Sequence, residues 1–561
     1  MPYFSSLLVF FLISVASGFS ATVAFSTENN STAGIATAHP LATQAGFEIL
    51  TQGGNAFDAA VAISATLAVV EPYSSGLGGG GFWLLHTAKN RQSVVVDGRE
   101  RAPYAASKSM YQDQQGNVIA GLSVDGALAA GIPGEPAALV HIAKKYGNLP
   151  LAKSLAPAIR LALKGFTVTE QYRRMAGFRL SALQQSPAAA KIFLDQNKVP
   201  KLGFTIVQHD LAKTLKRIAQ SGFDGFYKGA TARDLVKGSK ATNGIWSLKD
   251  LAEYTIVERK PLIGDYRGFR ITSVPPPSSG GVALLSMFNM LSNYEFDKLS
   301  KPKQQHLIVE VMRRAYRDRA EFLGDSDVVN VPVKKLISKS HARDLVKNLN
   351  LQKATNSSEL ARNLKLTEGQ DTTHFSVIDK DGNRISATLS INYPFGSCFV
   401  APGTGVLLND EMDDFSAKPG VPNVYGLVGA KANAIAPGKR MLSSMSPSFI
   451  ENDKRLAIIG TPGGSRIITM VFHGMMAFMN DADAKKIVDL PRYHHQYLPD
   501  VIHVESQAFS EHEKAALQKM GHSIKILNSN YGNMQIVILN KKTKKISAAS
   551  DFRGEGLAQV K

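Results

Sequence analysis

Hydrophobic positions follow two different patterns along the chain. Between about Ala129 and Asn348, apolar residues recur at the three- and four-residue spacing of amphipathic helices, as in PLAKSLAPAIRLALKGF and LIVEVMRRAYRDRAEFL. Beyond Thr372 they alternate with polar residues or form short runs between Gly, Asn and Asp, as in THFSVID, RISATLSIN, GTGVLLN, RLAIIG and MQIVIL. The pattern predicts a helix-rich first part, a strand-rich second part, and layered α and β structure instead of simple βαβ repetition.

Four further stretches refine this picture. GGNAFDAAVAISATLAVVEP predicts a buried helix that Asn55 caps and that ends before Pro72. In SSGLGGGGFWLL a strand follows the glycines and a helix does not, so we expect close backbone approach there and no phosphate-binding loop. GDYRGFRITSVPPPSSGG predicts a short strand that enters a rigid connection, and the polar segment 349–370 predicts a flexible lead-in to Thr372.

Composition narrows the class of protein. The chain has 561 residues, of which 44% are hydrophobic and 20% charged, so it can bury a large core and is globular. A net charge of +18 permits attraction to nucleic acid, anionic lipid or acidic substrates. No aromatic stacking pattern accompanies the densest basic run, so we expect a solvated hairpin turn there and no nucleic-acid partner. That run contains Lys541, Lys542, Lys544 and Lys545.

The N-terminus has the layout of a secretory signal. Leu7 to Val15 form a short apolar run, and small residues follow it. We expect residues 1–24 to be a signal peptide, cut between Gly18 and Ala24, and the mature protein to be periplasmic or secreted. No Lys or Arg precedes the run, so an uncleaved anchor is the alternative, although the run is short for a spanning helix.

Several familiar catalytic patterns are missing. The single cysteine, Cys398, excludes an internal disulfide and any multi-cysteine metal site. The chain has no G-x-S-x-G elbow, and Ala516 occupies the second ligand position of a zinc motif that begins at His512. His494 and His495 are adjacent, so their side chains point in different directions and are expected to be structural. We expect no metal and no organic cofactor.

Asp371 and Thr372 allow a different chemistry. A threonine at a chain's own N-terminus uses its free α-amine as the base and its hydroxyl as the nucleophile, so the chain must first be cut before Thr372. A polar segment followed by an acid and a hydroxyl residue at the start of a strand suits such a cut. The residues alone favour an ordinary turn made by Asp371 and the two threonines.

A resemblance favours the first interpretation. DTTHFSVIDKDGN, LLNDEMDDFSAKPGVPNVYGLVG, KRMLSSMSPS and GTPGGSRIIT resemble the small subunit of the γ-glutamyltransferases, which are N-terminal nucleophile hydrolases. GGNAFDAAVA, LGGGGF, VDGRERAP and PPPSSGG resemble the large subunit. The resemblance runs in order from about His39 to about Arg553 and implies an α+β fold, a four-layer αββα sandwich built as one folded unit from two chain segments.

The resemblance also implies self-processing. Cleavage between Asp371 and Thr372 would give a large subunit, residues 25–371, and a small subunit, residues 372–561. Thr372 would be the nucleophile, with Thr373 an ordinary neighbour, and the hydroxyl of Ser390 would hydrogen-bond Thr372. Many family members have threonine at the position of Ser390.

The remaining site residues follow from the chemistry of a γ-glutamyl group, which carries an α-carboxylate and an α-ammonium. The resemblance implies that Arg99 and Ser443, with Ser444 beside them, bind the carboxylate, and that Asn392, Glu411 and Asp414 bind the ammonium. It implies backbone donors for the developing oxyanion at Gly463 and Gly464. It also implies a lid over the pocket, residues 418–429, with Tyr425 at its tip.

The function expected is γ-glutamyl transfer and glutathione hydrolysis. Thr372 would take the γ-glutamyl group from glutathione or a related compound, and water, an amino acid or a peptide would then release it. Two alternatives stay open. One is a glutaryl or cephalosporin acylase of the same superfamily, whose substrate lacks the α-ammonium, and the other is an inactive secreted binding protein.

Overall fold

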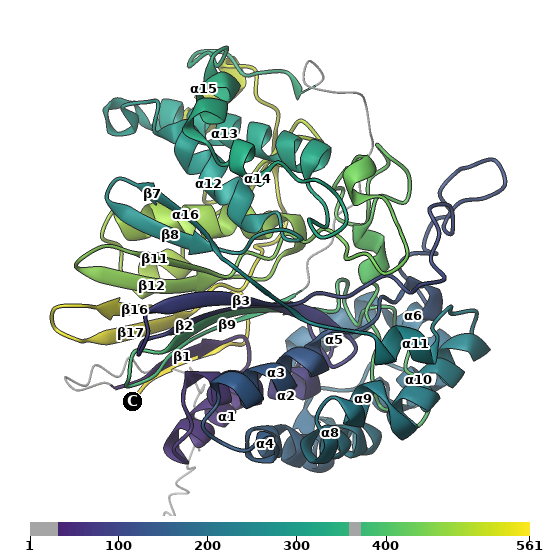
Figure 1. Ribbon diagram of the computed structural model, residues 1–561. Helices are drawn as coiled ribbons and strands as arrows, with labels where there is room; N and C mark the ends of the chain where they lie inside the picture. The colour runs from purple at the N-terminus through teal and green to yellow at the C-terminus, as the bar shows by residue number, and fades with distance from the viewer. Residues whose placement is uncertain (1–31, 358–371) are drawn as a thin grey trace, which may run out of the picture.

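Two antiparallel sheets form the centre of the molecule (Figure 1). The computed structural model describes residues 32–357 and 372–561. The first sheet has the strand order β18-β1-β9-β10-β2-β3-β6, and the second has the order β17-β16-β12-β11-β8-β7. Both sheets combine strands from before and after Thr372, so the two parts of the chain make one folded unit.

The strands of the first sheet are β18 (Leu557–Val560), β1 (Gly34–Thr37), β9 (Thr373–Ile378), β10 (Arg384–Ser390), β2 (Gly80–Thr87), β3 (Gln92–Gly98) and β6 (Val257–Arg259). Those of the second are β17 (Ile546–Ser550), β16 (Gln535–Asn540), β12 (Arg455–Gly460), β11 (Ser448–Glu451), β8 (Phe269–Ser273) and β7 (Leu262–Tyr266).

Helices cover the outer face of each sheet. The first sheet packs against α1 (Pro40–Thr51), α2 (Ala56–Val70) and α3 (Glu135–Tyr146), while α4 (Leu151–Lys164) packs on α2 and α8 (His209–Ser221) packs on α4 (Figure 1). The second packs against α12 (Gly280–Leu291) and α16 (Ile467–Met479), while α13 (Lys301–Phe322) and α15 (Lys339–Val346) pack on α12 (Figure 1). The predicted four-layer αββα sandwich is therefore confirmed.

Shorter elements complete the fold. The helices are α5 (Glu170–Phe178), α6 (Leu180–Gln185), α7 (Pro187–Phe193), α9 (Asp224–Tyr227), α10 (Gly229–Ala241), α11 (Leu248–Ala252), α14 (Val333–Leu336), α17 (Ala484–Val488) and α18 (Glu511–Lys519). The strands are β4 (Phe166–Thr167), β5 (Thr205–Ile206), β13 (Tyr493–His494), β14 (Ile502–Val504) and β15 (Ile524–Ile526).

Strand alternation explains the layers. On β2, Trp83 and Leu85 join the apolar core under α1–α4, whereas Phe82 and Leu84 face the other way, into the core shared with the second sheet. Between the sheets lies buried His374, whose ring accepts or donates hydrogen bonds with hydroxyls of neighbouring residues. A side chain at Gly460 would come within 2.2 Å of this ring, so only glycine fits there.

The helix predicted after Asn55 is confirmed as α2. Asn55 accepts hydrogen bonds from the N–H groups of Phe57 and Asp58, while Asp58 accepts one from the N–H of Asn55, which is a capping box. Every residue of α2 is buried. Pro72 follows the last turn, and Glu71 lies at the C-cap.

The glycine run is packed against backbone, as predicted. A Cβ atom at Gly78 would lie 2.0 Å from the carbonyl oxygen of Leu407, and one at Gly80 would lie 2.3 Å from that of Gly98. These contacts leave no room for side chains. They bring β2 and the loop before it against the segment that precedes Glu411.

Two strand predictions were wrong in detail. GTGVLLN is no strand, because it pairs only through isolated bridges such as Gly78 with Leu408, and it bends at Gly405, where φ is 66°. GDYRGFRITSV contains two strands instead of one, because β7 and β8 turn at Arg267 and Gly268, both in the left-handed region. The hairpin turn expected at Lys541–Lys545 joins β16 to β17.

Other predictions fall partly outside the described residues. The signal peptide, residues 1–24, and Asp371 lie there. Before the gap, Thr355 and Ser357 are held by hydrogen bonds to Glu310 and Asp500, so this end of the predicted lead-in is anchored. Across residues 32–357 and 372–561, no helix has the length and apolar character that crossing a membrane requires.

Candidate active site

Thr372 lies directly before β9, an interior strand of the first sheet, and next to Ser390. Strand β9 begins at Thr373, which pairs with Leu389, and this register sets Thr372 beside the end of β10. The hydroxyl oxygens of Thr372 and Ser390 are 3.5 Å apart, and both residues are buried. Ser390 Oγ also accepts a hydrogen bond of 2.8 Å from the N–H of Asn392, which orients it.

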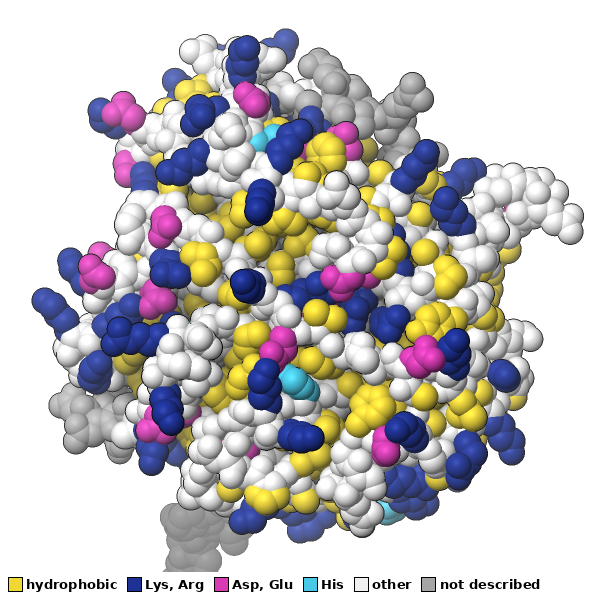
Figure 2. Space-filling view, in the orientation of Figure 1, with side chains coloured by type: hydrophobic (Ala, Val, Ile, Leu, Met, Phe, Trp, Pro, Cys, Tyr) yellow, Lys and Arg dark blue, Asp and Glu magenta, His cyan; other side chains and the backbone are white. Residues whose placement is uncertain are grey.

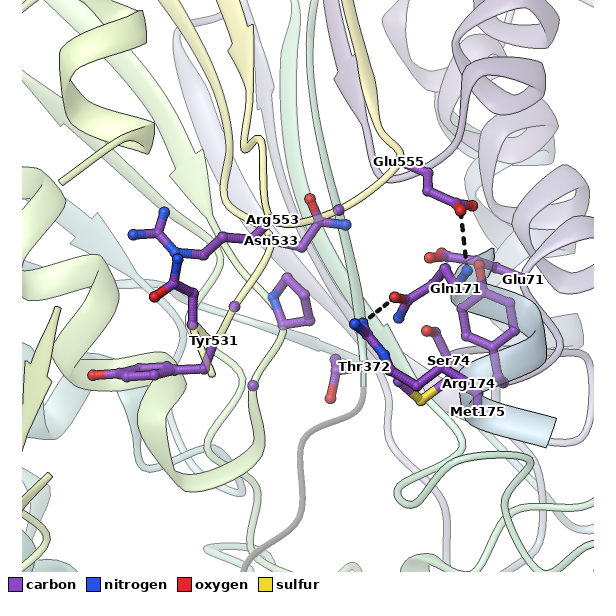
Figure 3. Close-up of a pocket in the computed structure, with 16 residues that line it drawn as sticks. Glu71, Ser74, Gln171, Arg174, Met175, Thr372, Tyr531, Asn533, Arg553 and Glu555 are labelled. Atoms are coloured by element: carbon purple, nitrogen blue, oxygen red, sulfur yellow. Dashed lines mark hydrogen bonds between the residues drawn. The ribbon is translucent and has the colours of Figure 1, made fainter. Parts of the chain in front are cut away.

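Thr372 separates two cavities. The inner cavity is lined by Thr372, Ser390, Tyr425 and Gly464. The six residues expected to bind substrate line it too: Arg99, Asn392, Glu411, Asp414, Ser443 and Ser444. The outer cavity lies on the other side of Thr372, between α5 and the C-terminal segment (Figure 3).

Arg99 is the buried cation of the inner cavity. Only 1% of it is exposed, and its Nη1 and Nη2 atoms each lie 2.5 Å from a carboxylate oxygen, of Glu411 and Asp414 respectively. Both acids belong to one 3₁₀ turn, Glu411–Asp414. Burial raises the pKa of Glu411 to about 7, against the opposing effect of Arg99. The inner cavity therefore presents a cation and two acids side by side.

The serine pair is supported from behind. The carbonyl of Ser443 accepts hydrogen bonds from the N–H and the hydroxyl of Ser279, in the PPPSSGG segment. Buried Arg319 on α13 donates from Nε to Ser279 Oγ and from Nη2 to Ser444 Oγ, at 3.1 and 3.2 Å. Sequence reasoning missed Arg319, because it stands in a basic helical stretch that predicts a solvated face.

Gly463 and Gly464 both need glycine. Their φ angles are 137° and 53°, in the region that side chains disfavour. A Cβ atom at Gly464 would lie 2.5 Å from the ring of Tyr425. Within the described residues, neither backbone N–H makes a hydrogen bond. Both N–H groups are thus available to a ligand beside Thr372.

Tyr425 closes the inner cavity. Its hydroxyl donates to the carbonyl of Asn392, which adopts a left-handed φ of 75°, and the residue is only 6% exposed. The loop is fastened to the acids beneath it, since the N–H of Val424 donates to Asp413 and the amide of Asn423 to Asp414. Tyr425 and Leu427, within the segment 418–429, thus line the inner cavity. That the segment acts as a lid stays a prediction.

Glu71 and Thr373 were not foreseen as site residues. Thr373 Oγ1 donates a hydrogen bond of 2.7 Å to Glu71 Oε2, so Thr373 fixes a carboxyl group beside Thr372. Burial raises the pKa of Glu71 to about 8. In the sequence, a Glu-Pro pair after a helix indicates only a helix end, so no local signal identified Glu71.

The histidines are structural. His494 and His495 are fully buried, and burial lowers the pKa of both, that of His495 to about 4. His494 Nδ1 bonds to Thr469 Oγ1 and its Nε2 to Gln496, while His495 bonds to Asp500. Their side chains lead to different partners, as expected.

One group of described side chains has the spacing of metal ligands: His306, Glu310 and His522. The carboxylate of Glu310 already forms ion pairs with Arg313 and Arg314, and the two rings are hydrogen-bonded to each other at 2.7 Å. Two adjacent guanidinium groups repel a cation. We therefore interpret the three residues as structural: the hydrogen bond between His306 on α13 and His522 joins this helix to the C-terminal part of the chain.

Basic side chains are distributed over the surface. Figure 2 shows Lys and Arg scattered over the visible face, with Asp and Glu among them and apolar atoms between. In the run at Lys541–Lys545, Lys541 pairs with Glu451 at 2.6 Å. On this face the charge forms no continuous basic stripe of the kind that nucleic-acid binding requires.

The chain is similar to known proteins over most of its length. The family model described as Gamma-glutamyltranspeptidase matches residues 42–560. A glutathione hydrolase proenzyme of Pseudomonas sp. (strain A14) is 42% identical over 492 residues, covering 87% of this chain and 85% of that protein. The Escherichia coli (strain K12) glutathione hydrolase proenzyme is 41% identical over 529 residues, covering 92% and 90%.

A solved structure has the same overall fold. The cephalosporin acylase from Bacillus halodurans superposes with a TM-score of 0.84 at 27% identity, covering 98% of this chain and 99% of that one. Because the family model spans nearly the whole chain and the relatives exceed 40% identity, the chain belongs to the γ-glutamyltranspeptidase family.

Proposed function

We propose that the protein is a self-processing γ-glutamyltransferase and glutathione hydrolase. The observation that carries this proposal is the inner cavity beside Thr372, where Arg99 faces Glu411 and Asp414. A γ-glutamyl group bears an α-carboxylate and an α-ammonium on one carbon. A cation next to two acids is complementary to both charges at once.

Thr372 is the proposed nucleophile. In the precursor its hydroxyl attacks the carbonyl of Asp371, and hydrolysis of the resulting ester releases the α-amine of Thr372. That amine then accepts the hydroxyl proton when Thr372 attacks the γ-carbonyl of a substrate. Ser390 Oγ, 3.5 Å from Thr372 Oγ1, steadies the hydroxyl in both steps. The products of the cut are a large subunit, residues 25–371, and a small subunit, residues 372–561.

Each remaining residue has a proposed role. Arg99 and Ser443, with Ser444, bind the α-carboxylate, and Asn392, Glu411 and Asp414 bind the α-ammonium. An incoming zwitterion inserts between Arg99 and the acids, so their direct ion pair is replaced by two ion pairs to substrate. The N–H groups of Gly463 and Gly464 stabilise the oxyanion, and Tyr425 limits water access.

The substrate of an acylase differs from a γ-glutamyl compound by the absence of the α-nitrogen. A glutaryl side chain has no α-ammonium, so Glu411 and Asp414 would face an apolar carbon and lose a charged partner. The acids therefore favour γ-glutamyl over glutaryl substrates, although a cephalosporin acylase shares the fold.

We propose export to the periplasm or the exterior, on the basis of residues 1–24.

The test compares two chromogenic anilides with the purified enzyme. γ-Glutamyl-p-nitroanilide should be hydrolysed and glutaryl-p-nitroanilide should not. The opposite preference would identify an acylase, and no activity towards either anilide from an uncut chain would favour a binding protein.

A further inference from the structure

Arg319 lies directly behind the serine pair of the inner cavity. It stands on α13, and only 4% of it is exposed. Its Nε donates a hydrogen bond of 3.1 Å to Ser279 Oγ, and its Nη2 donates one of 3.2 Å to Ser444 Oγ. Hydroxyl groups are neutral, so neither serine balances the positive charge of the guanidinium.

In the part of the chain that the structure describes, no carboxylate forms an ion pair with Arg319. On the same helix, Arg313 and Arg314 are buried as well, but both form ion pairs with Glu310. Burial lowers the pKa of Arg319, and the charge that most opposes this effect is that of Asp414, in the lining of the inner cavity. A buried cation without a counterion is unfavourable, so an anion in the inner cavity would stabilise it.

The hydrogen bonds around the serine pair run from Arg319 toward the inner cavity. Ser279 Oγ accepts from Arg319 and donates to the carbonyl of Ser443 at 2.7 Å, which fixes the backbone of the pair. Ser444 Oγ accepts from Arg319 and makes no other hydrogen bond within the described residues, so its own hydrogen remains to be donated. Since Ser444 lines the inner cavity, this hydrogen is available to a ligand there. A cation that donates to a hydroxyl also strengthens the bond that the hydroxyl donates.

We propose that Arg319 is a positioning residue that makes the inner cavity select a carboxylate over an uncharged group at the α-carbon of the substrate. It holds Ser443 and Ser444 as hydrogen-bond donors and adds a second positive charge to that of Arg99. The inference rests on the proposed function and deepens it, because it assigns part of the specificity to a residue that does not touch the substrate. Arg319 takes no part in bond making at Thr372, so its replacement should affect binding more than kcat.

The test uses two competitive inhibitors of γ-glutamyl-p-nitroanilide hydrolysis: L-glutamate, and isoglutamine, in which the α-carboxylate of glutamate is an amide. For wild type, the inhibition constant KI of glutamate should be the lower of the two. Arg319→Met removes the charge, so it should raise the KI of glutamate about tenfold, the low end of the range for a hydrogen bond that involves a charged group. It should raise the KI of isoglutamine much less. A purely structural role would raise both KI values alike.

Two further variants separate the charge from the hydrogen bonds. Arg319→Lys keeps the charge and loses the forked geometry, so it should retain more of the preference for glutamate than Arg319→Met does. Ser279→Ala keeps the charge but breaks the link to Ser443, so it should reduce the preference about two- to fivefold, as expected for a neutral hydrogen bond. If Arg319→Met yields no cut enzyme, a reduced preference in Ser279→Ala supports the inference and an unchanged one overturns it.

Arg317→Met is the matched control, since Arg317 lies on the same helix but is partly exposed and pairs with Asp318. Three results would overturn the inference: equal KI values for the two inhibitors in an active wild type, an unchanged KI ratio in Arg319→Met, or an equal change of this ratio in Arg317→Met. A wild type that fails to hydrolyse γ-glutamyl-p-nitroanilide would instead refute the proposed function.

Discussion

Arg99 and Asp414, 315 positions apart in the sequence, form an ion pair of 2.5 Å in the lining of the inner cavity. If Asp414 binds the α-ammonium of the substrate, Asp414→Asn should lower kcat/KM for γ-glutamyl-p-nitroanilide about 10- to 100-fold, because a hydrogen bond to a charged group contributes roughly 1.5–3 kcal/mol. Steady-state kinetics measure this loss. An equal fractional loss with glutaryl-p-nitroanilide, if that anilide turns over, would contradict the role.

The raised pKa of Glu411 predicts that kcat/KM depends on pH. Burial raises its pKa to about 7, so the carboxylate that attracts an ammonium forms only as the pH rises through this value. We expect kcat/KM for the γ-glutamyl anilide to increase between about pH 6 and 8. Glu411→Gln should flatten this limb, since an amide accepts a hydrogen bond without titrating. A profile that keeps the limb in the variant would assign it to another group.

Gly464 predicts a steric effect on catalysis. An added methyl group would press on the ring of Tyr425 and displace an N–H beside Thr372, so Gly464→Ala should lower kcat on the order of 100-fold. Gly403→Ala is the control, because Gly403 also has a positive φ, 81°, but an added Cβ meets nothing within 4 Å. Similar kcat losses in both variants would mean that backbone strain alone explains the result.

The raised pKa of Glu71 predicts that the stability of the folded chain depends on pH. Burial raises its pKa from 4.5 to about 8, so between these values the folded chain keeps a proton that the unfolded chain releases, and rising pH lowers the free energy of unfolding. The slope reaches about 1.4 kcal/mol per pH unit. Glu71→Gln should reduce the fall in Tm between about pH 5 and 8. The comparison uses the Thr372→Ala background, in which both chains should be uncut, and an equal fall in both would contradict the shift.

Local signals predicted α2 well. Asn55 and Pro72 mark its ends through capping and ring geometry, which depend only on nearby residues. The apolar run GTGVLLN failed, because hydrophobicity near Leu407 reports burial and does not distinguish a strand from a buried loop. The layers were predicted, but the mixing of strands from both chain segments in each sheet depends on long-range pairing that no local pattern encodes.

The candidate site was predicted mainly through resemblance. Taken alone, Arg99 and the acids of DEMDD look like surface charge, yet the fold buries Arg99 against Glu411. Glu71 and Arg319 were not predicted, because their roles arise from tertiary contacts. Glu71 contacts Thr373, and Arg319 contacts Ser444. Charged residues acquire such roles only when distant segments meet, so the sequence around each carries no sign of them.

The central claim is that Thr372 gains a free amine and acts as the nucleophile. Its most direct test is N-terminal sequencing of the purified fragments of wild type and of Thr372→Ala, with activity measured on the same samples. Wild type should yield an active enzyme with a fragment that begins Thr372-Thr373-His374, and Thr372→Ala should remain one inactive chain. Full activity from a chain whose Thr372 is still in peptide linkage would contradict the account.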